Sequence, residues 1–382
     1  AGKQATALKI FGSNQKLKKS VKGPLNIVNK IIYSHNSKQF AVVGGKGSGL
    51  MIYNTSTHDL VKQIKLNHTL YDIAFNSAGD IYAAGKKYVY QWRQGDYKLI
   101  NKIRIHQGYA SSLAISEKNN LLAIGKGYSL EGNINFDVDL YQLNNFEFIT
   151  SLKGHTGEVI RTTFTADEKY LITASQDGTF RLWNAKNPLQ YFVFFGHDKN
   201  TYGVFSSDNF YTASAKAKDL VAYEQAGKLF PVSQFDAIYR RPDVLLKSVG
   251  YSEAQTIQLY QKAHTKWLKK MQINPELING QLKVPSVNID SHHPTVTNQR
   301  KINLKFSAMD KLVKLDHYVV YINNIPITGQ LKNLLTAKTS LEIELSSGKN
   351  VIEVSVFNQQ GIESLKDHLV ITYKNKIKKP DL

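Results

Sequence analysis

The sequence predicts a mainly β protein in three parts: a β-propeller, a short helical segment and a β-sandwich. Residues 1–235 carry marks that recur about every 40 residues, which is the length of one four-stranded propeller blade. Residues 281–376 show short strands of alternating hydrophobicity between regular turn signals, as is typical of a sandwich. The hydrophobic content of 42% and the charged content of 21% are those of a folded globular chain.

The clearest repeat runs over residues 154–195. It opens with Gly154-His155, and three short β-rich runs and a fourth follow before the next pair, Gly196-His197. The two Gly-His pairs lie 42 residues apart, within the range for one blade.

The predicted third strand of each blade ends on an aromatic residue. The intervals between these aromatics are 42, 39, 49, 42 and 40 residues, and the residues are Phe11, Tyr53, Trp92, Tyr141, Trp183 and Tyr223. The long interval holds Tyr128–Asn135, which predicts an extended hairpin loop. Five units therefore follow the first mark, at about Gly23–Leu66, Asn67–Ile105, His106–Lys153, Gly154–Phe195 and Gly196–Phe235.

The segment from Gly154 to Trp183 resembles a WD repeat, with Asn184 in place of the usual Asp after the tryptophan. In that family a hydrogen-bonded tetrad braces each blade. The resemblance places the tetrad at His155, Ser175, Asp177 and Trp183. A buried indole N–H needs an acceptor and an Asp can fix a histidine tautomer, so we interpret the four residues as structural rather than catalytic.

The amino end leaves the blade count open. LKIF and LKKSV look like a third and a fourth strand with no first and second strand before them. Either the chain is a fragment of a longer propeller, or residues 5–22 complete the last blade of a closed one. The fragment interpretation is favoured because Leu220–Tyr223 predicts a third strand within the last unit.

Beyond the propeller, residues 236–280 predict a helical junction and a linker. A short helix is expected after Pro242, and a longer one from Ser252 to Met271, where apolar residues recur at helical spacing. Residues 281–376 predict an immunoglobulin-like sandwich, followed by a tail, 377–382, that leads to a missing C-terminal domain. The expected strands are Val284–Ile289, Lys301–Ala308, Leu315–Ile322, Ser340–Leu345, Asn350–Phe357 and Leu365–Tyr373.

Two stretches, residues 234–244 and 321–365, resemble bacterial proteins that join WD repeats to a caspase-like peptidase domain. The first reads QFDAIYRRPDV, and the second contains YINNIPI, SGKNVIEV and GIESL. The resemblance implies that this chain is the non-catalytic recognition or regulatory region of such a protease. The propeller would then bind a protein partner, and the sandwich would link it to the peptidase.

The absence of cysteine excludes disulfides, thiolate metal sites and a caspase-type nucleophile within the sequence. We predict no catalytic site, no cofactor and no metal. The histidines beside Pro294 have too few acidic neighbours to suggest a metal site. No apolar run is long enough to span a membrane. Ligand-contact residues are expected in the loops Gly44–Gly49 and Tyr128–Asn135.

Two other functions stay open. One is a stand-alone scaffold or extracytoplasmic protein–protein interaction module, and the other is a basic propeller that binds nucleic acid, because 49 Lys and Arg oppose 30 Asp and Glu for a net charge of +19. A propeller hydrolase is a more distant possibility, because the acidic residues are scattered. The resemblance to the WD-repeat and peptidase proteins implies a bacterial origin. The N-terminal Ala-Gly is compatible with signal cleavage and equally with a fragment boundary, and an exported, periplasmic location is slightly favoured over a cytoplasmic one.

Overall fold

The computed structural model describes residues 5–25, 27–105, 108–128, 136–225, 227–271, 273, 284–290, 293–331 and 334–374. The predicted linker at 274–280, the tail at 377–382 and all but Tyr128 of the 128–135 loop lie outside these residues. The chain divides into two compact units, residues 1–208 (unit 1) and 209–382 (unit 2).

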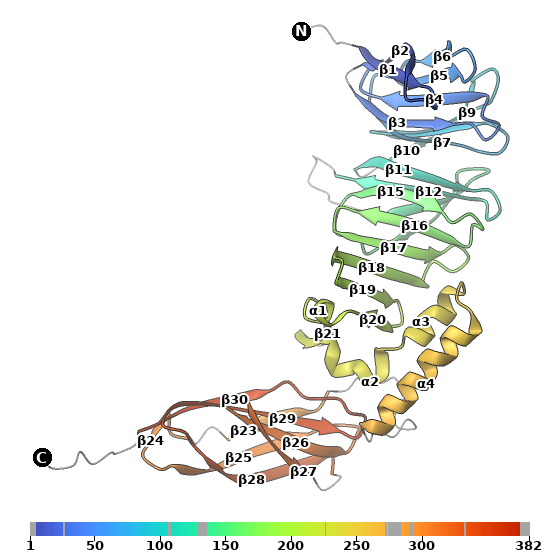
Figure 1. The fold of residues 1–382 in the computed structure, drawn as a ribbon. Helices are drawn as coiled ribbons and strands as arrows, with labels where there is room; N and C mark the ends of the chain where they lie inside the picture. The colour runs from blue at the N-terminus through green and yellow to red at the C-terminus, as the bar shows by residue number, and fades with distance from the viewer. Residues whose placement is uncertain are drawn as a thin grey trace, which may run out of the picture. The chain divides into compact units, whose positions relative to one another are not determined.

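Unit 1 is a series of antiparallel sheets in which each strand pairs with its neighbours in chain order (Figure 1). A two-stranded sheet comes first, then three four-stranded sheets, and then a longer sheet. Their strands are β1 (Ala5–Phe11) and β2 (Leu17–Leu25); β3 (Val28–Tyr33), β4 (Gln39–Gly44), β5 (Leu50–Asn54) and β6 (Leu60–Ile64); β7 (Leu70–Phe75), β8 (Ile81–Gly85), β9 (Tyr88–Trp92) and β10 (Leu99–Arg104); β11 (Tyr109–Ser116), β12 (Leu121–Gly127), β13 (Val138–Gln142) and β14 (Phe148–Leu152); and β15 (Val159–Phe164), β16 (Tyr170–Ser175), β17 (Thr179–Asn184), β18 (Tyr191–Asp198) and β19 (Thr201–Ser206).

Consecutive sheets share their hydrophobic cores. Ile52 of the β3–β6 sheet packs in one cluster with Trp92 of the β7–β10 sheet. Tyr82 of that sheet packs with Leu122 of the next sheet, and Leu140 packs with Trp183 in the same way. A single sheet of this size cannot bury a core alone, so each one depends on its neighbours. This is a propeller-like arrangement of sheets.

The hairpin turns of unit 1 repeat their backbone geometry. Between the third and fourth strands of successive sheets, a non-glycine residue adopts positive φ: His58 at 62°, Tyr97 at 56° and Phe146 at 61°. Each lies five residues after a predicted mark, Tyr53, Trp92 or Tyr141. The left-handed conformation is rarely adopted by such residues, so its recurrence shows that the turns are structurally equivalent.

Polar contacts also join neighbouring sheets. Asp72 on β7 is fully buried, pairs with Lys30 Nζ of β3 at 2.7 Å and accepts the backbone N–H of Leu113 on β11 at 3.0 Å. In the turn after β11, Glu117 accepts both the N–H and the hydroxyl of Ser77, each at 2.6 Å. Glu168 makes the equivalent contact between the next two sheets, where it accepts the backbone N–H of Lys118 at 2.9 Å.

Unit 2 begins with short strands and single-turn helices, followed by two longer helices, α3 and α4. They are β20 (Tyr211–Ala213), α1 (Ala215–Lys218), β21 (Ala222–Gln225), β22 (Lys228–Pro231), η1 (Val232–Phe235), α2 (Asp236–Tyr239), α3 (Pro242–Val249) and α4 (Ala254–Lys270). Pro242 stands at the start of α3, and Gly250 ends it with φ of 73°. Both predicted helices are therefore present with bounds close to those expected.

The strand predicted at Leu220–Tyr223 differs from the expectation. Tyr223 lies on β21, which pairs with β22 in a two-stranded sheet rather than serving as the third strand of a four-stranded one. The preceding segment Ala-Lys-Ala-Lys forms α1, whose first turn is capped by the Ser214 side chain. Alanine and lysine favour helix over strand, so local preference interrupts the repeat at this point.

The rest of unit 2 consists of two sheets around one core. One sheet has the order β23-β25-β28 and the other the order β24-β30-β29-β26-β27. The strands are β23 (Ser286–Ile289), β24 (Val296–Thr297), β25 (Lys301–Met309), β26 (Leu315–Ile322), β27 (Ile325–Gln330), β28 (Thr336–Glu344), β29 (Gly348–Asn358) and β30 (Asp367–Tyr373). Leu304 of β25 and Val354 of β29, one from each sheet, are both fully buried in this core.

Two strands show how far the pattern could be predicted. β26 has the bounds predicted for it, and its last five residues, Tyr318–Ile322, form an uninterrupted run of apolar and aromatic residues. β27 was not predicted, although it follows the Asn323-Asn324 turn signal. Both asparagines adopt positive φ, 50° and 71°, which is the geometry of a tight hairpin turn and brings β27 back along β26.

Candidate functional site

Three of the four predicted tetrad residues meet in one buried network. His155 Nδ1 lies 2.9 Å from Asp177 Oδ2, and His155 Nε2 lies 2.8 Å from Thr173 Oγ1. Trp183 Nε1 donates to the same Thr173 oxygen at 3.0 Å. An ionised carboxylate only accepts hydrogen bonds, so the donors run from Trp183 through Thr173 and His155 to Asp177.

The network differs from the prediction at Ser175. This serine donates to the Gly157 carbonyl at 2.8 Å and accepts the backbone N–H of Asp177, so it fixes the turn rather than joining Trp183. Thr173 takes the central place because it lies two positions from Leu171, the residue that pairs with Trp183 across the sheet. The hydroxyl at Thr173 therefore reaches the indole, whereas Ser175 lies further along the strand.

The protonation states fit a structural brace. Burial lowers the pKa of His155 and outweighs the opposing effect of Asp177, so the ring is neutral at pH 7. Burial also opposes ionisation of Asp177, but hydrogen bonds from Thr179, His155 and the backbone prevail and lower its pKa to about 2. A hydroxyl, imidazole and carboxylate in this order resemble a catalytic triad, but Thr173 is fully buried and already accepts the indole N–H.

The predicted aromatic marks occupy different environments. Tyr53, Trp92 and Trp183 are buried near the ends of β5, β9 and β17, and Tyr141 is half-buried on β13. Phe11 ends β1 and is exposed. Tyr223 lies in unit 2, where its ring packs edge-on against Phe235. The marks therefore do not converge on one site.

Of the loops expected to contact a ligand, Gly44–Gly49 offers little surface. Lys46 is its only exposed residue, and Ser48 is fully buried. Gly49 has φ of 64°, and a Cβ at this position would lie 1.8 Å from the Ile64 carbonyl oxygen. The loop is therefore packed against the β6 end of its own sheet.

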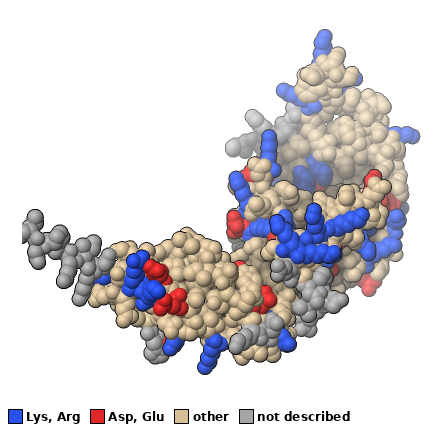
Figure 2. All heavy atoms as spheres, turned by 60° about the horizontal axis from the view of Figure 1, so that its bottom comes forward, with Lys and Arg blue, Asp and Glu red and all other residues tan. Residues whose placement is uncertain are grey.

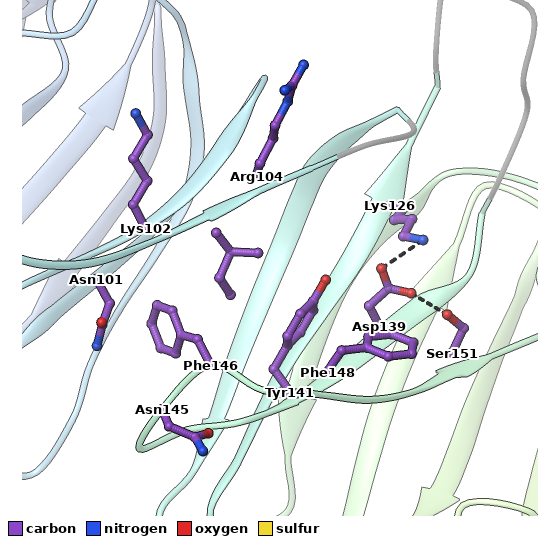
Figure 3. Close-up of a pocket in the computed structure, with 11 residues that line it drawn as sticks. Asn101, Lys102, Arg104, Lys126, Asp139, Tyr141, Asn145, Phe146, Phe148 and Ser151 are labelled. Atoms are coloured by element: carbon purple, nitrogen blue, oxygen red, sulfur yellow. Dashed lines mark hydrogen bonds and ion pairs between the residues drawn. The ribbon is translucent and has the colours of Figure 1, made fainter.

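A groove of about 730 Å³ opens between β10 and the next sheet (Figure 3). Asn101, Lys102 and Arg104 come from β10 on one side, and the side chains across from them come from β12, β13, β14 and the turn before β14. Its full lining is Asn101, Lys102, Ile103, Arg104, Lys126, Asp139, Tyr141, Asn145, Phe146, Phe148 and Ser151. We refer to it as the β10–β14 groove.

One wall of the β10–β14 groove is braced by a buried ion pair. Lys126 Nζ lies 2.8 Å from Asp139 Oδ2, with each side chain 9% exposed, and Ser151 Oγ donates to Asp139 Oδ1 at 2.6 Å. Figure 3 shows the three side chains joined in a row. Because these charges satisfy each other, they add no net charge to the groove.

The same groove carries an aromatic surface. Tyr141 and Phe148 pack edge-on with ring centres 5.5 Å apart, and Phe148 remains 54% exposed. Burial, followed by the charge of Asp139, raises the pKa of Tyr141 to about 12, so its hydroxyl stays protonated and can donate. Phe146 contributes a third ring from the left-handed turn position.

Two cations stand on the β10 side. Lys102 Nζ lies 3.6 Å from the centre of the Tyr88 ring, which orients the ammonium group without neutralising it. Arg104 is exposed and forms no ion pair with the described residues. The β10–β14 groove therefore combines apolar rings with two uncompensated positive charges. Sequence reasoning missed it because its residues carry no motif.

The described residues contain neither a metal-binding cluster nor a membrane-spanning helix. No three His, Asp or Glu side chains there come close enough together to hold a metal ion. No helix in the same region of the chain has the length and apolar character needed to cross a membrane.

Comparison with known proteins identifies the repeat. The family model "WD domain, G-beta repeat" matches residues 146–184, from the turn before β14 to the end of β17. Target of rapamycin complex subunit LST8 of Saccharomyces cerevisiae is 33% identical over 54 residues, which are 14% of this chain and 18% of that protein. The match thus spans less than a fifth of the length of that relative.

Two solved structures are similar at the level of the sheets. The structure of U3-55K has 13% identity and a TM-score of 0.39, and the similarity covers 53% of this chain and 68% of that chain. The WD40 domain of Neurospora crassa Pan2 has 12% identity and a TM-score of 0.42, with 56% and 68% covered. The segment matched by the WD repeat family model, residues 146–184, holds the buried network and lies within the series of propeller-like sheets.

Proposed function

We propose that the sheets of unit 1 form a scaffold that binds a protein partner through the β10–β14 groove. The observation that carries the proposal is the combination of three aromatic rings with two unneutralised cations in one groove. Aromatic and arginine side chains contribute most of the binding energy in protein interfaces. WD40 repeat proteins typically serve as protein-interaction scaffolds, which agrees with this proposal.

The groove favours an extended segment of the partner. An apolar side chain of that segment would pack on Phe148 and Tyr141, and a neighbouring carboxylate would pair with Arg104. The buried pair of Lys126 and Asp139 would keep the opposite wall in place without competing for that carboxylate.

A displayed library of random linear peptides tests this proposal. Selection on the full chain is expected to enrich peptides with an aromatic or large aliphatic residue next to Asp or Glu. Binding of the enriched peptides should fall roughly tenfold or more for the double variant Phe148→Ser/Arg104→Gln. The matched control Leu189→Ser/Arg161→Gln changes an exposed leucine and an exposed arginine elsewhere in unit 1. Equal loss in both variants, or enrichment without this pattern, would refute the groove.

We further propose that the chain is the recognition region of a bacterial caspase-like protease. The support is the resemblance of residues 234–244 and 321–365 to proteins of that kind. The chain has no cysteine, so a caspase-type cysteine nucleophile would have to come from another segment or another chain. A reading frame that continues into a domain with a His and Cys pair would support the proposal, and one that ends at residue 382 or encodes an unrelated domain would refute it.

We also propose that the two-sheet region of unit 2 is an immunoglobulin-like sandwich that links the scaffold to such a partner. The support is the pair of sheets around one core, with three and five strands, in which all pairs are antiparallel except β24 with β30.

A further inference from the structure

Helix α4 combines a buried face with a strongly basic one. Its 17 residues contain no Asp or Glu and four lysines. Leu268 and Trp267 pack with Ala237 and Ile273, and His264 Nε2 donates to the Ala237 carbonyl at 3.1 Å. These contacts fix which side of the helix faces the rest of unit 2.

The lysines lie on the opposite side. At 3.6 residues per turn, Leu259 and the four lysines fall within an arc of about 100°. Leu259 is 67% exposed, and every one of the lysines is exposed. We call this surface the α4 basic stripe; it consists of Leu259, Lys262, Lys266, Lys269 and Lys270.

Within the described residues, no carboxylate neutralises the positive charge of the α4 basic stripe. None of its lysines forms an ion pair within the described residues, whereas Lys19, Lys218 and Lys301 each pair with a carboxylate. Figure 2 shows Lys and Arg side chains gathered over the helical region of unit 2, with few Asp or Glu side chains among them. Like charges four residues apart repel one another, as Lys262, Lys266 and Lys270 do here.

The chemistry of the stripe favours one class of partner. A helix that lies in a membrane surface inserts its apolar face, but Leu268 and Trp267 on that face of α4 are already packed against Ala237 and Ile273. Nucleic-acid surfaces combine Lys and Arg for the phosphates with aromatic rings that stack on bases, and the stripe contains no aromatic ring. An exposed leucine beside the lysines instead suits a protein surface that is both acidic and apolar.

The spacing of the charges agrees with a helical partner. Lys262, Lys266 and Lys270 recur every four residues, or about 6 Å along the axis. Carboxylates four residues apart on a second helix have the same spacing. We propose that the α4 basic stripe is a docking surface for an acidic helix of a protein partner, whose aliphatic side chain would contact Leu259. This proposal does not rest on the β10–β14 groove.

The test uses the full chain and a synthetic helical peptide with Glu at every fourth position and one leucine on the same face. Binding is measured by fluorescence anisotropy over a range of salt concentrations. The variant Lys262→Gln/Lys266→Gln/Lys270→Gln should bind the peptide roughly tenfold more weakly, and Leu259→Ser should weaken binding by a factor that persists at high salt. The control Lys65→Gln/Lys153→Gln/Lys199→Gln removes the same charge from exposed positions in unit 1 and should change binding less than twofold.

Parallel measurements with oligothymidylate and with vesicles containing phosphatidylserine separate the other sources of negative charge. A preference for the peptide that is lost only in the stripe variant supports the proposal. Equal loss in both triple variants would mean that net charge alone drives binding, and it would overturn the proposal. A stripe-dependent affinity for the oligonucleotide or the vesicles that exceeds the affinity for the peptide would overturn it as well.

Discussion

Replacing Asp177 with Asn would test whether an ionised carboxylate braces the WD40 repeat. Asp177 Oδ2 accepts from His155 Nδ1 at 2.9 Å and from the Thr156 N–H at 3.1 Å. Oδ1 accepts from the N–H and the hydroxyl of Thr179 at 2.8 and 2.7 Å. Asparagine has the same size but replaces one acceptor oxygen with an NH₂ donor, which in either orientation would face a backbone N–H.

The pKa of Asp177 gives the size of the expected loss in the free energy of unfolding. It falls from 3.8 to about 2 in the folded chain, and one pKa unit corresponds to about 1.4 kcal/mol. The side chain is only 8% exposed, so solvent screening reduces this value little. Ionisation therefore adds about 2.5 kcal/mol to the free energy of unfolding at pH 7. With the cost of an unpaired buried donor, Asp177→Asn is expected to lower that free energy by roughly 2–4 kcal/mol.

Urea unfolding followed by tryptophan fluorescence measures the loss. The folded pKa of Asp177 lies below the unfolded value, so its contribution is complete above about pH 4 and declines as the pH falls towards 2. Wild type should lose most of that contribution over this range, and Asp177→Asn should not. His155, whose pKa is lowered by burial, adds a separate loss of stability as the pH falls below its unfolded value of 6.5.

An exposed carboxylate provides the control. Asp208→Asn should change the free energy of unfolding by less than about 0.5 kcal/mol, because Asp208 lies at the surface. If Asp177→Asn were as stable as this control, with an acid profile matching wild type, the reasoning about the network would be refuted.

Other positions give further tests. Asp139→Asn leaves Lys126 buried without its partner and should lower the free energy of unfolding, measured in urea, by about 3–5 kcal/mol. The double variant Lys126→Met/Asp139→Leu should lower it much less. Equal losses in the two variants would contradict the buried pair. Gly49→Ala places a Cβ 1.8 Å from the Ile64 carbonyl oxygen, so this variant should have a lower melting temperature than Gly95→Ala. Gly95 also has positive φ, but no described atom lies within 4 Å of a Cβ there. The reverse order of melting temperatures would contradict the packing at Gly49. Tyr141→Phe should remove one phenol that ionises near pH 12 from an ultraviolet titration, and an unchanged curve there would place Tyr141 in solvent.

The repeat was predictable because it depends on pattern alone. The aromatics Tyr53, Trp92, Tyr141 and Trp183 recur near the ends of β5, β9, β13 and β17, at the spacing of the sheets. The second Gly-His pair was misleading, because Gly196 and His197 lie near the end of β18 within one continuous sheet, and the predicted unit Gly196–Phe235 does not form a sheet of its own. The identity of the hydroxyl in the network was not predictable. Thr173 and Ser175 lie on the same strand two residues apart, so alternation places both on one face. Only the register with β17, which pairs Leu171 with Trp183, selects Thr173.

The β10–β14 groove could not be predicted for a different reason. Its residues come from strands of two sheets, and nothing in the sequence says which faces of those strands meet. Lys102 and Arg104 look like ordinary exposed positions on an outer strand. The prediction at Leu220–Tyr223 failed because an aromatic at the expected interval is not sufficient. The Ala-Lys-Ala-Lys segment before it prefers a helix, and periodicity cannot reveal that preference.

The buried carboxylate of Asp72 has a consequence for how unit 1 loses its structure. It holds a lysine of the preceding sheet and a backbone N–H of the following one. If the preceding sheet detached alone, Lys30 would leave with it and a buried negative charge would remain without its counterion, at a cost of several kcal/mol. If the following sheet detached alone, the same carboxylate would lose a backbone N–H donor. Successive sheets are thereby tied into one cooperative transition, and unravelling from one end, as in many linear repeat arrays, is disfavoured at this point.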